Sequence, residues 1–129
     1  MKRAVVCGGA IVAACVLGAA GALAGPWEDG MVRYNRGDYV PAIHLFRPLA
    51  EAGNSKAQSQ MGTMYRKGQG VGRSMARAFM WFSLAAKRGD AQAKTNMREV
   101  EKAMTPTELT QARDMAAACE ASNYRDCAY

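Results

Sequence analysis

Two of the four cysteines, Cys119 and Cys127, stand near the end of the chain with seven residues between them. In an exported protein an even pair of cysteines predicts a disulfide. A redox pair is the alternative, but the Cys-x-x-Cys spacing typical of redox motifs is absent. Zinc would need more ligands than two thiols, and no histidine lies nearby in the sequence. We therefore expect a structural Cys119–Cys127 disulfide, with neither a metal nor another cofactor.

The other side chains capable of catalysis do not combine into a recognisable active site. His44 is the only histidine, and it stands beside the apolar residues Leu45 and Phe46. No Ser-His-Asp or Cys-His arrangement can be assembled around it. No serine has a lysine three residues later, so the Ser-x-x-Lys motif is missing. The nine methionines stand mostly at core spacing, which favours packing over copper binding. We expect a protein that is not an enzyme.

The beginning of the chain has the composition of a secretory signal peptide. Lys2-Arg3 precedes a run of small and apolar side chains over residues 4–23, and Ala22-Leu23-Ala24 forms a small-x-small processing site. We expect cleavage after Ala24 and a secreted or periplasmic protein that meets a membrane only through this segment. An uncleaved membrane anchor is one alternative, because about 20 apolar residues can span a bilayer. A lipoprotein modified at Cys15 is another, but the apolar run continues past that residue.

Cleavage would leave residues 25–129 as one small globular domain. Half of the sequence is hydrophobic and 22% is charged, as in an ordinary globular chain. Without Lys2 and Arg3, 15 basic residues face 11 acidic ones, a net charge of +4. Because the two signs are interspersed and no aromatic-and-basic RNA motif is present, we expect no nucleic-acid binding.

The elements that must position any functional residue are helices. Residues 57–89 hold two helical patterns joined by a glycine-rich turn. The apolar stripes contain Ala57, Met61, Met64 and Tyr65 on the first helix and Ala78, Trp81, Phe82, Ala85 and Ala86 on the second. Small residues such as Gly62 stand opposite the large Tyr65 and Trp81, so that two antiparallel helices can approach closely. The glycines of residues 68–72 predict a turn with positive φ angles, because no P-loop lysine follows them.

The same pattern recurs along the chain. A shift of 36 residues superimposes Phe82 and Gly89 on Phe46 and Gly53, and the opposite shift carries Met61 onto Met97. A repeat of helix pairs near this length predicts an all-α fold, an α-solenoid of antiparallel helix pairs. Start and stop residues predict six helices after the signal helix, over about 26–36, 38–53, 54–67, 74–89, 90–104 and 105–120. The expected N-cap residues are Asp38, Asn54 or Ser55, Ser74 and Asp90. Thr105 and Glu108 predict a capping box at the start of the last helix.

These residues resemble a known repeat family. The full unit reads Gly62-x-x-Tyr65-x-x-Gly68-x-Gly70-Val71 and then Ala78-x-x-Trp81-x-x-x-Ala85-Ala86-x-x-Gly89. This pattern resembles the Sel-one-like repeat, a relative of the tetratricopeptide repeat with a longer, glycine-marked turn. The resemblance covers roughly residues 28–104 and implies a helical repeat domain over residues 25–129 with the last helix as a cap. The spacing of Cys119 and Cys127 also resembles that of a cysteine-rich subgroup of the family.

The family commonly supplies adaptors and scaffolds, so the resemblance implies a protein or peptide partner bound in a concave groove. The first helix of each pair would line that groove. The side chains implied are Lys56, Ser59, Thr63, Arg66 and Lys67 in the full unit, Gln92 and Thr95 with Glu99 and Lys102 in the terminal unit, and Asn35 and Arg36 in the first unit. The cations predict a ligand with acidic or carboxylate groups, and a merely solvated helix face is the alternative.

Two further functions follow from the resemblance. Some cysteine-rich members are credited with β-lactam binding or hydrolysis, which is the alternative to an adaptor, although the Ser-x-x-Lys motif is absent here. A short solenoid can also self-associate through its exposed edge.

Overall fold

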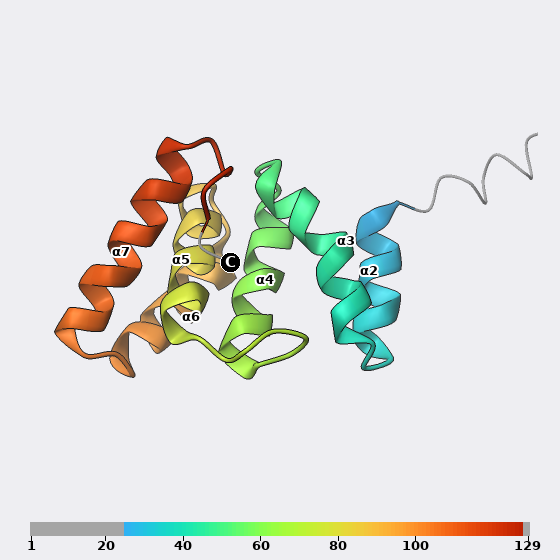
Figure 1. The fold of residues 1–129 in the computed structure, drawn as a ribbon, viewed down its shortest axis with the longest axis horizontal. Coiled ribbons are helices and arrows are strands. Elements are labelled where there is room, and N and C mark those ends of the chain that lie inside the picture. Colours follow the sequence, from blue (N-terminus) through green and yellow to red (C-terminus); the bar gives the residue numbers. More distant parts are fainter. Residues whose placement is uncertain (1–24, 128–129) are drawn as a thin grey trace, which may run out of the picture.

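The computed structural model describes residues 25–127 (Figure 1). The expected signal peptide, residues 1–24, lies outside the described residues, as do residues 128 and 129. The described chain is all-helical and contains no strand. Its helices are α2 (Pro26–Asn35), α3 (Tyr39–Glu51), α4 (Ser55–Lys67), α5 (Met75–Lys87), α6 (Ala91–Lys102) and α7 (Pro106–Ala121). The predicted six-helix, all-α fold is confirmed.

Side-chain caps begin most of these helices at the predicted residues. An oxygen of Asn54, Ser74 or Asp90 accepts a hydrogen bond from the backbone N–H three residues later, at 3.0, 3.2 and 2.9 Å. Thr105 and Glu108 form the expected reciprocal capping box before α7. Asp38 occupies the predicted N-cap position of α3, but its side chain makes no capping hydrogen bond. Its ψ of 67° lies outside the extended conformation of a capping residue.

Glycines end the helices and shape the longer turn. Four of them follow a helix with positive φ, namely Gly37, Gly53, Gly68 and Gly89. The helix α5 ends at Lys87, two residues before the predicted stop, because Arg88 and Gly89 already form the turn. Gly70 has φ of 74°, and an added Cβ would lie 2.8 Å from the carbonyl carbon of Tyr39. The turn between α4 and α5 therefore packs against the start of α3, which only glycine permits there.

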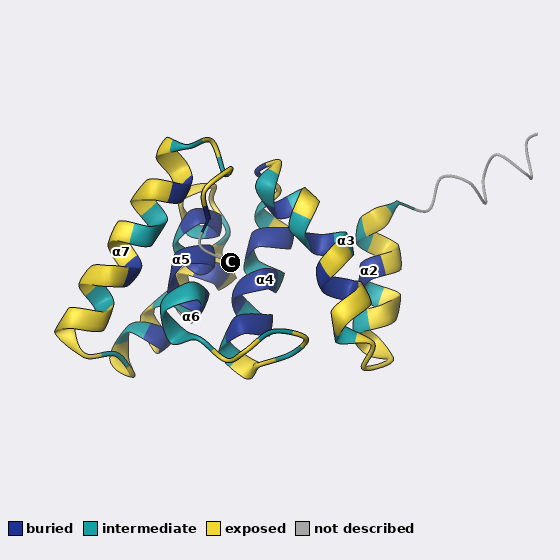
Figure 2. Cartoon of the chain, in the orientation of Figure 1, coloured by how far each residue is buried: buried dark blue, intermediate teal, exposed yellow. Residues whose placement is uncertain are grey.

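Each of the first two helix pairs contains a glycine that faces a phenylalanine ring. An added Cβ on Gly30 would lie 2.5 Å from Phe46, and one on Gly62 would lie 2.6 Å from Phe82. These approaches bring α2 onto α3 and α4 onto α5 at close range. Trp81 is fully buried and Tyr65 is 4% exposed, so the large side chains lie in the core as predicted. Figure 2 shows the buried residues concentrated on α4 and α5, in the middle of the array.

The last two helices depart from the regular pairing. We expected α6 and α7 to form a terminal pair, with α7 acting as a cap. Instead, α7 packs along α5, while α6 packs against α5 without extensive contact to α7 (Figure 1). Buried small residues, Ala112 and Cys119, face inward from α7 and permit this approach. The end of the array is thus closed by α7 lying over the second pair.

Candidate functional site

The helix α4 carries a polar stripe on the side opposite its buried residues. Its inward face holds Ala57, Met61, Met64 and Tyr65, all buried. On the outward side, Lys56 and Lys67 are exposed and Ser59, Thr63 and Arg66 are half-buried. The Thr63 hydroxyl donates to the carbonyl of Ser59 at 3.2 Å, which leaves the hydroxyl oxygen free to accept. The first predicted cluster of site residues is therefore contiguous and accessible along one helix.

The helix α6 presents the matching residues of the next unit. Gln92, Thr95, Glu99 and Lys102 are all exposed. Lys102 Nζ lies 3.2 Å from Glu99 Oε1, so these two opposite charges form an ion pair within one helix turn. The Gln92 amide donates to Asn96 Oδ1 at 3.3 Å. This half of the predicted face is polar, and its two charged side chains, Glu99 and Lys102, neutralise each other.

The stripes of α4 and α6 meet at a hollow. It has a volume of about 280 Å³ and is lined by Arg66, Met75, Glu99, Val100 and Ala103. Of the predicted site residues, the structure brings Arg66 and Glu99 together here. Lys56 lies ten residues earlier on α4, about 15 Å away along the helix axis. Met75, Val100 and Ala103 were not predicted, and they give the hollow an apolar part beside the guanidinium group.

The predicted residues of the first unit, Asn35 and Arg36, lie at the end of α2. Both are exposed. The hydroxyl of Tyr34 donates to Gln69 Oε1 at 2.9 Å, which joins this end of α2 to the turn after α4. The C-terminal ends of α2 and α4 therefore lie on the same side of the molecule, which places Asn35 and Arg36 on the side of Arg66 and Lys67.

The cations of the α4 stripe differ from several other basic residues in having no acidic partner. Three ion pairs form among residues 25–127: Lys87 with Glu120 at 2.6 Å, Lys102 with Glu99 at 3.2 Å and Arg113 with Glu101 at 3.4 Å. None of them involves Lys56, Arg66 or Lys67. In the described part of the chain, these three positive charges are available to an anionic group from outside.

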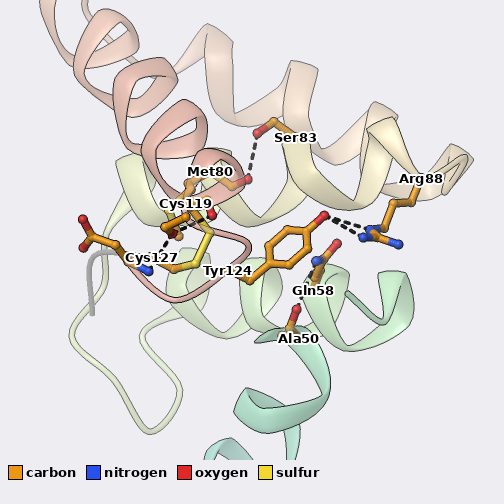
Figure 3. Close-up of a disulfide and its surroundings, with 10 residues drawn as sticks. Ala50, Gln58, Met80, Ser83, Arg88, Cys119, Tyr124 and Cys127 are labelled. Atoms are coloured by element: carbon orange, nitrogen blue, oxygen red, sulfur yellow. Dashed lines mark hydrogen bonds between the residues drawn. A yellow bond between two sulfur atoms is a disulfide. The ribbon is translucent and has the colours of Figure 1, made fainter. Parts of the chain in front are cut away.

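Cys119 and Cys127 form the expected disulfide, and both are buried (Figure 3). The Tyr124 N–H donates to the Cys119 carbonyl at 2.8 Å, which ties the tail to α7. The Tyr124 hydroxyl also accepts from Nε and Nη2 of Arg88, at 3.0 and 2.7 Å. An added Cβ on Gly53 would lie 2.7 Å from Arg88 Nη2. The tail and Arg88 thus connect the ends of α3, α5 and α7.

The sequence contained a partial indication of the contact between Arg88 and Tyr124. An aromatic residue inside a short cysteine loop, and an arginine beside a helix-ending glycine, are both visible in the chain. Nothing in their spacing shows that they meet, because 36 residues separate them.

The remaining candidate residues do not gather into a second chemical centre. His44 is exposed on the outer side of α3. Among the described side chains, no three of His, Cys, Asp and Glu come close enough together to hold a metal ion. Met61 and Met64 are fully buried, as expected of packing residues. Within residues 25–127, no helix has the length and apolarity needed to cross a membrane.

The stacked antiparallel pairs, closed by α7, define an α-solenoid. The family model described as Sel1 repeat matches residues 23–54 and 55–90, which together make up more than half of the chain. The protein therefore belongs to the Sel1 repeat family, whose repeats are generally protein-interaction modules. The two matched segments contain the pairs α2–α3 and α4–α5, and α6 and α7 lie beyond them. No curated protein matches this chain in a sequence comparison.

Proposed function

We propose that the outward stripes of α4 and α6 bind a partner protein through a segment that carries carboxylate groups. The observation that carries this proposal is the row of cations without acidic partners on α4, formed by Lys56, Arg66 and Lys67. Arginine recognises a carboxylate through two parallel hydrogen bonds, which makes Arg66 the principal anchor. Lys56 and Lys67 add attraction near the two ends of the helix.

The hollow beside Arg66 supports the same proposal. Its apolar part, from Met75, Val100 and Ala103, is suited to one aliphatic side chain of the partner. A carboxylate close to that side chain would reach the Arg66 guanidinium, while Glu99 disfavours a second anion on the α6 side. The segment that fits best therefore places an apolar residue next to an acidic one. Acidic residues further along would meet Lys56, about 15 Å away.

We further propose that this binding takes place in the periplasm, after removal of residues 1–24. The buried Cys119–Cys127 disulfide supports this compartment, since such bonds persist in oxidising environments. The basic balance of the sequence favours encounter with anionic partners there.

The test begins with site-specific photo-crosslinking in intact cells. A photoreactive residue replaces Ser59 on the proposed face or Thr110 on the exposed side of α7, and the crosslinked protein is identified by mass spectrometry. We expect a discrete partner from position 59 only. The same partner from both positions, or none from position 59, would count against the proposed face.

Affinity for the captured partner is then measured with purified protein. The variant R66E/K67E should weaken binding at least about tenfold, because a favourable charge-assisted contact becomes a repulsive one. The matched control K94E/R125E makes the same change in net charge away from this face, at exposed residues, and should bind nearly normally. Equal losses in the two variants would show that only overall charge matters.

A nitrocefin turnover assay on the same preparation separates binding from β-lactam hydrolysis. We expect no turnover above buffer. Turnover by the native chain would replace the adaptor proposal with an enzymatic one.

A further inference from the structure

The outer side of the first helix pair has an unusual surface. We call it the N-terminal edge, and it consists of Asp29, Val32 and Arg33 on α2 and Val40, Pro41 and His44 on α3. Asp29, Arg33, Val40, Pro41 and His44 line a hollow of about 390 Å³ there, together with Leu45. Nothing else within residues 25–127 covers this side, whereas α7 and the tail cover the other end of the array (Figure 1).

The edge holds the exposed large hydrophobic residues of the described chain. Val32 is 48% exposed and Val40 is 55% exposed, and no other large apolar residue among those described reaches this level. Single exposed valines are ordinary on a protein surface. Here, however, the two valines lie on adjoining helices, and Val40 lines the open hollow beside Pro41. They add apolar side chains to an edge that otherwise carries charged residues.

The charges on this edge complement a second copy of the same edge. Asp29 and Arg33 are one helical turn apart on α2, both are exposed, and neither forms an ion pair within the described residues. In two antiparallel copies of α2 related by a two-fold axis near Met31, Asp29 of each would face Arg33 of the other. One surface would then form two identical ion pairs, as a two-fold interface requires.

We propose that the protein forms a two-fold symmetric dimer through the N-terminal edge. Val32 and Val40 of each copy pack across the axis, with the two Asp29–Arg33 pairs beside them. The outward stripes of α4 and α6 lie on other helices, so each dimer presents two copies of the proposed binding face. This proposal does not depend on the proposed function.

The dimer is expected to be weak. A stable interface typically engages about 20–30 residues on each side, and this edge offers far fewer. We therefore expect dissociation in the micromolar to millimolar range, as in transient complexes. The two-fold symmetry has a useful consequence, because each substitution changes two contacts at once.

The test measures the oligomeric state of the protein purified from cells. Mass spectrometry first determines at which residue this protein begins. Sedimentation velocity over about 10 μM to 1 mM should show a concentration-dependent dimer. D29R and R33D should each weaken dimerisation about tenfold, because each turns two ion pairs into like-charge contacts. The double variant D29R/R33D exchanges the charges and should restore dimerisation to within about threefold of the native chain.

Two further variants complete the test. V40T removes apolar character without a change of shape and should weaken the dimer, while D114R makes the same charge change as D29R at an exposed site on α7 and should leave it intact. Circular dichroism verifies the fold of each variant. A monomer at every concentration would overturn the proposal, as would a dimer that D29R leaves unchanged or that the double variant fails to restore. If residues 1–24 are retained and crosslink to position 40, the chain covers its own edge and the proposal is equally overturned.

Discussion

The contact between Gly62 and Phe82 yields the sharpest prediction about the fold. An added Cβ at Gly62 would lie 2.6, 2.7 and 3.0 Å from three carbons of the Phe82 ring. Phe82 is fully buried, so its ring has little room to move away. The substitution G62A therefore forces α4 and α5 apart or distorts the ring, although alanine is the better helix former.

Two opposing terms set the magnitude. Replacing a mid-helix glycine by alanine stabilises the helix by about 1 kcal/mol. Overpacking a close-packed core costs roughly 1–3 kcal/mol, and contacts near 2.6 Å place this case at the upper end. The net expectation is destabilisation by about 2 kcal/mol, which lowers the melting temperature of a domain of this size by roughly 8–16 °C.

Urea unfolding followed by far-UV circular dichroism measures this free energy, with thermal melts in parallel. G72A is the matched control, because its Cβ meets no atom within 4 Å and its φ is not positive, so it should be neutral or slightly stabilising. G89A has equally open space but a φ of 93°, and it should lose about 1 kcal/mol from backbone conformation alone. The reasoning is refuted if G62A is as stable as the native chain, or if F82L fails to recover part of the loss in the double variant.

Two predictions concern the tail. C119S/C127S should lower the free energy of unfolding by about 2–3 kcal/mol in the chain-entropy model, and a reductant should then have no further effect, as urea titrations with and without dithiothreitol can check. Y124F removes the hydroxyl that accepts from Arg88 and should lower the free energy of unfolding by about 0.5–1.5 kcal/mol. In a double-mutant cycle with R88A, the two losses of stability should not add. Full additivity would exclude a direct interaction.

The fold could be predicted in detail because its determinants are local. The apolar stripe of each helix, the glycines at the helix ends and the capping residues act within a few positions of one another. Asn54, Ser74 and Thr105 accordingly cap the helices that the sequence assigned to them. At Asp38 the predicted N-cap position is confirmed, but its ψ of 67° keeps the side chain from making the capping hydrogen bond.

What the sequence could not supply were relations between distant segments. The packing of α7 against α5 depends on how small residues on two separate helices fit together. Helical spacing alone is compatible with α7 packing on α5 or on α6. The apolar part of the hollow has the same origin, because Met75 comes from α5 and Val100 from α6. The site residues on α4 were implied by the resemblance to the repeat family, and their role in binding remains a prediction.

The placement of α7 and the tail bears directly on how a short array can bind a partner. In a short array, few neighbouring repeats hold the helices of a binding face in position. If these helices move in the free protein, binding must restrict that motion, and the entropy lost lowers the affinity. Here the guanidinium of Arg88 lies against Gly53 at the end of α3 and donates to Tyr124 beyond α7, while the disulfide fixes the segment that carries Tyr124. Gly53 directly precedes Asn54, the N-cap of α4, and Arg88 lies two residues before Asp90, the N-cap of α6. These contacts therefore restrain the turns from which both helices of the proposed face start. On the proposed binding face, we therefore expect the tail to keep the Lys56 end in a fixed geometry without itself touching the partner.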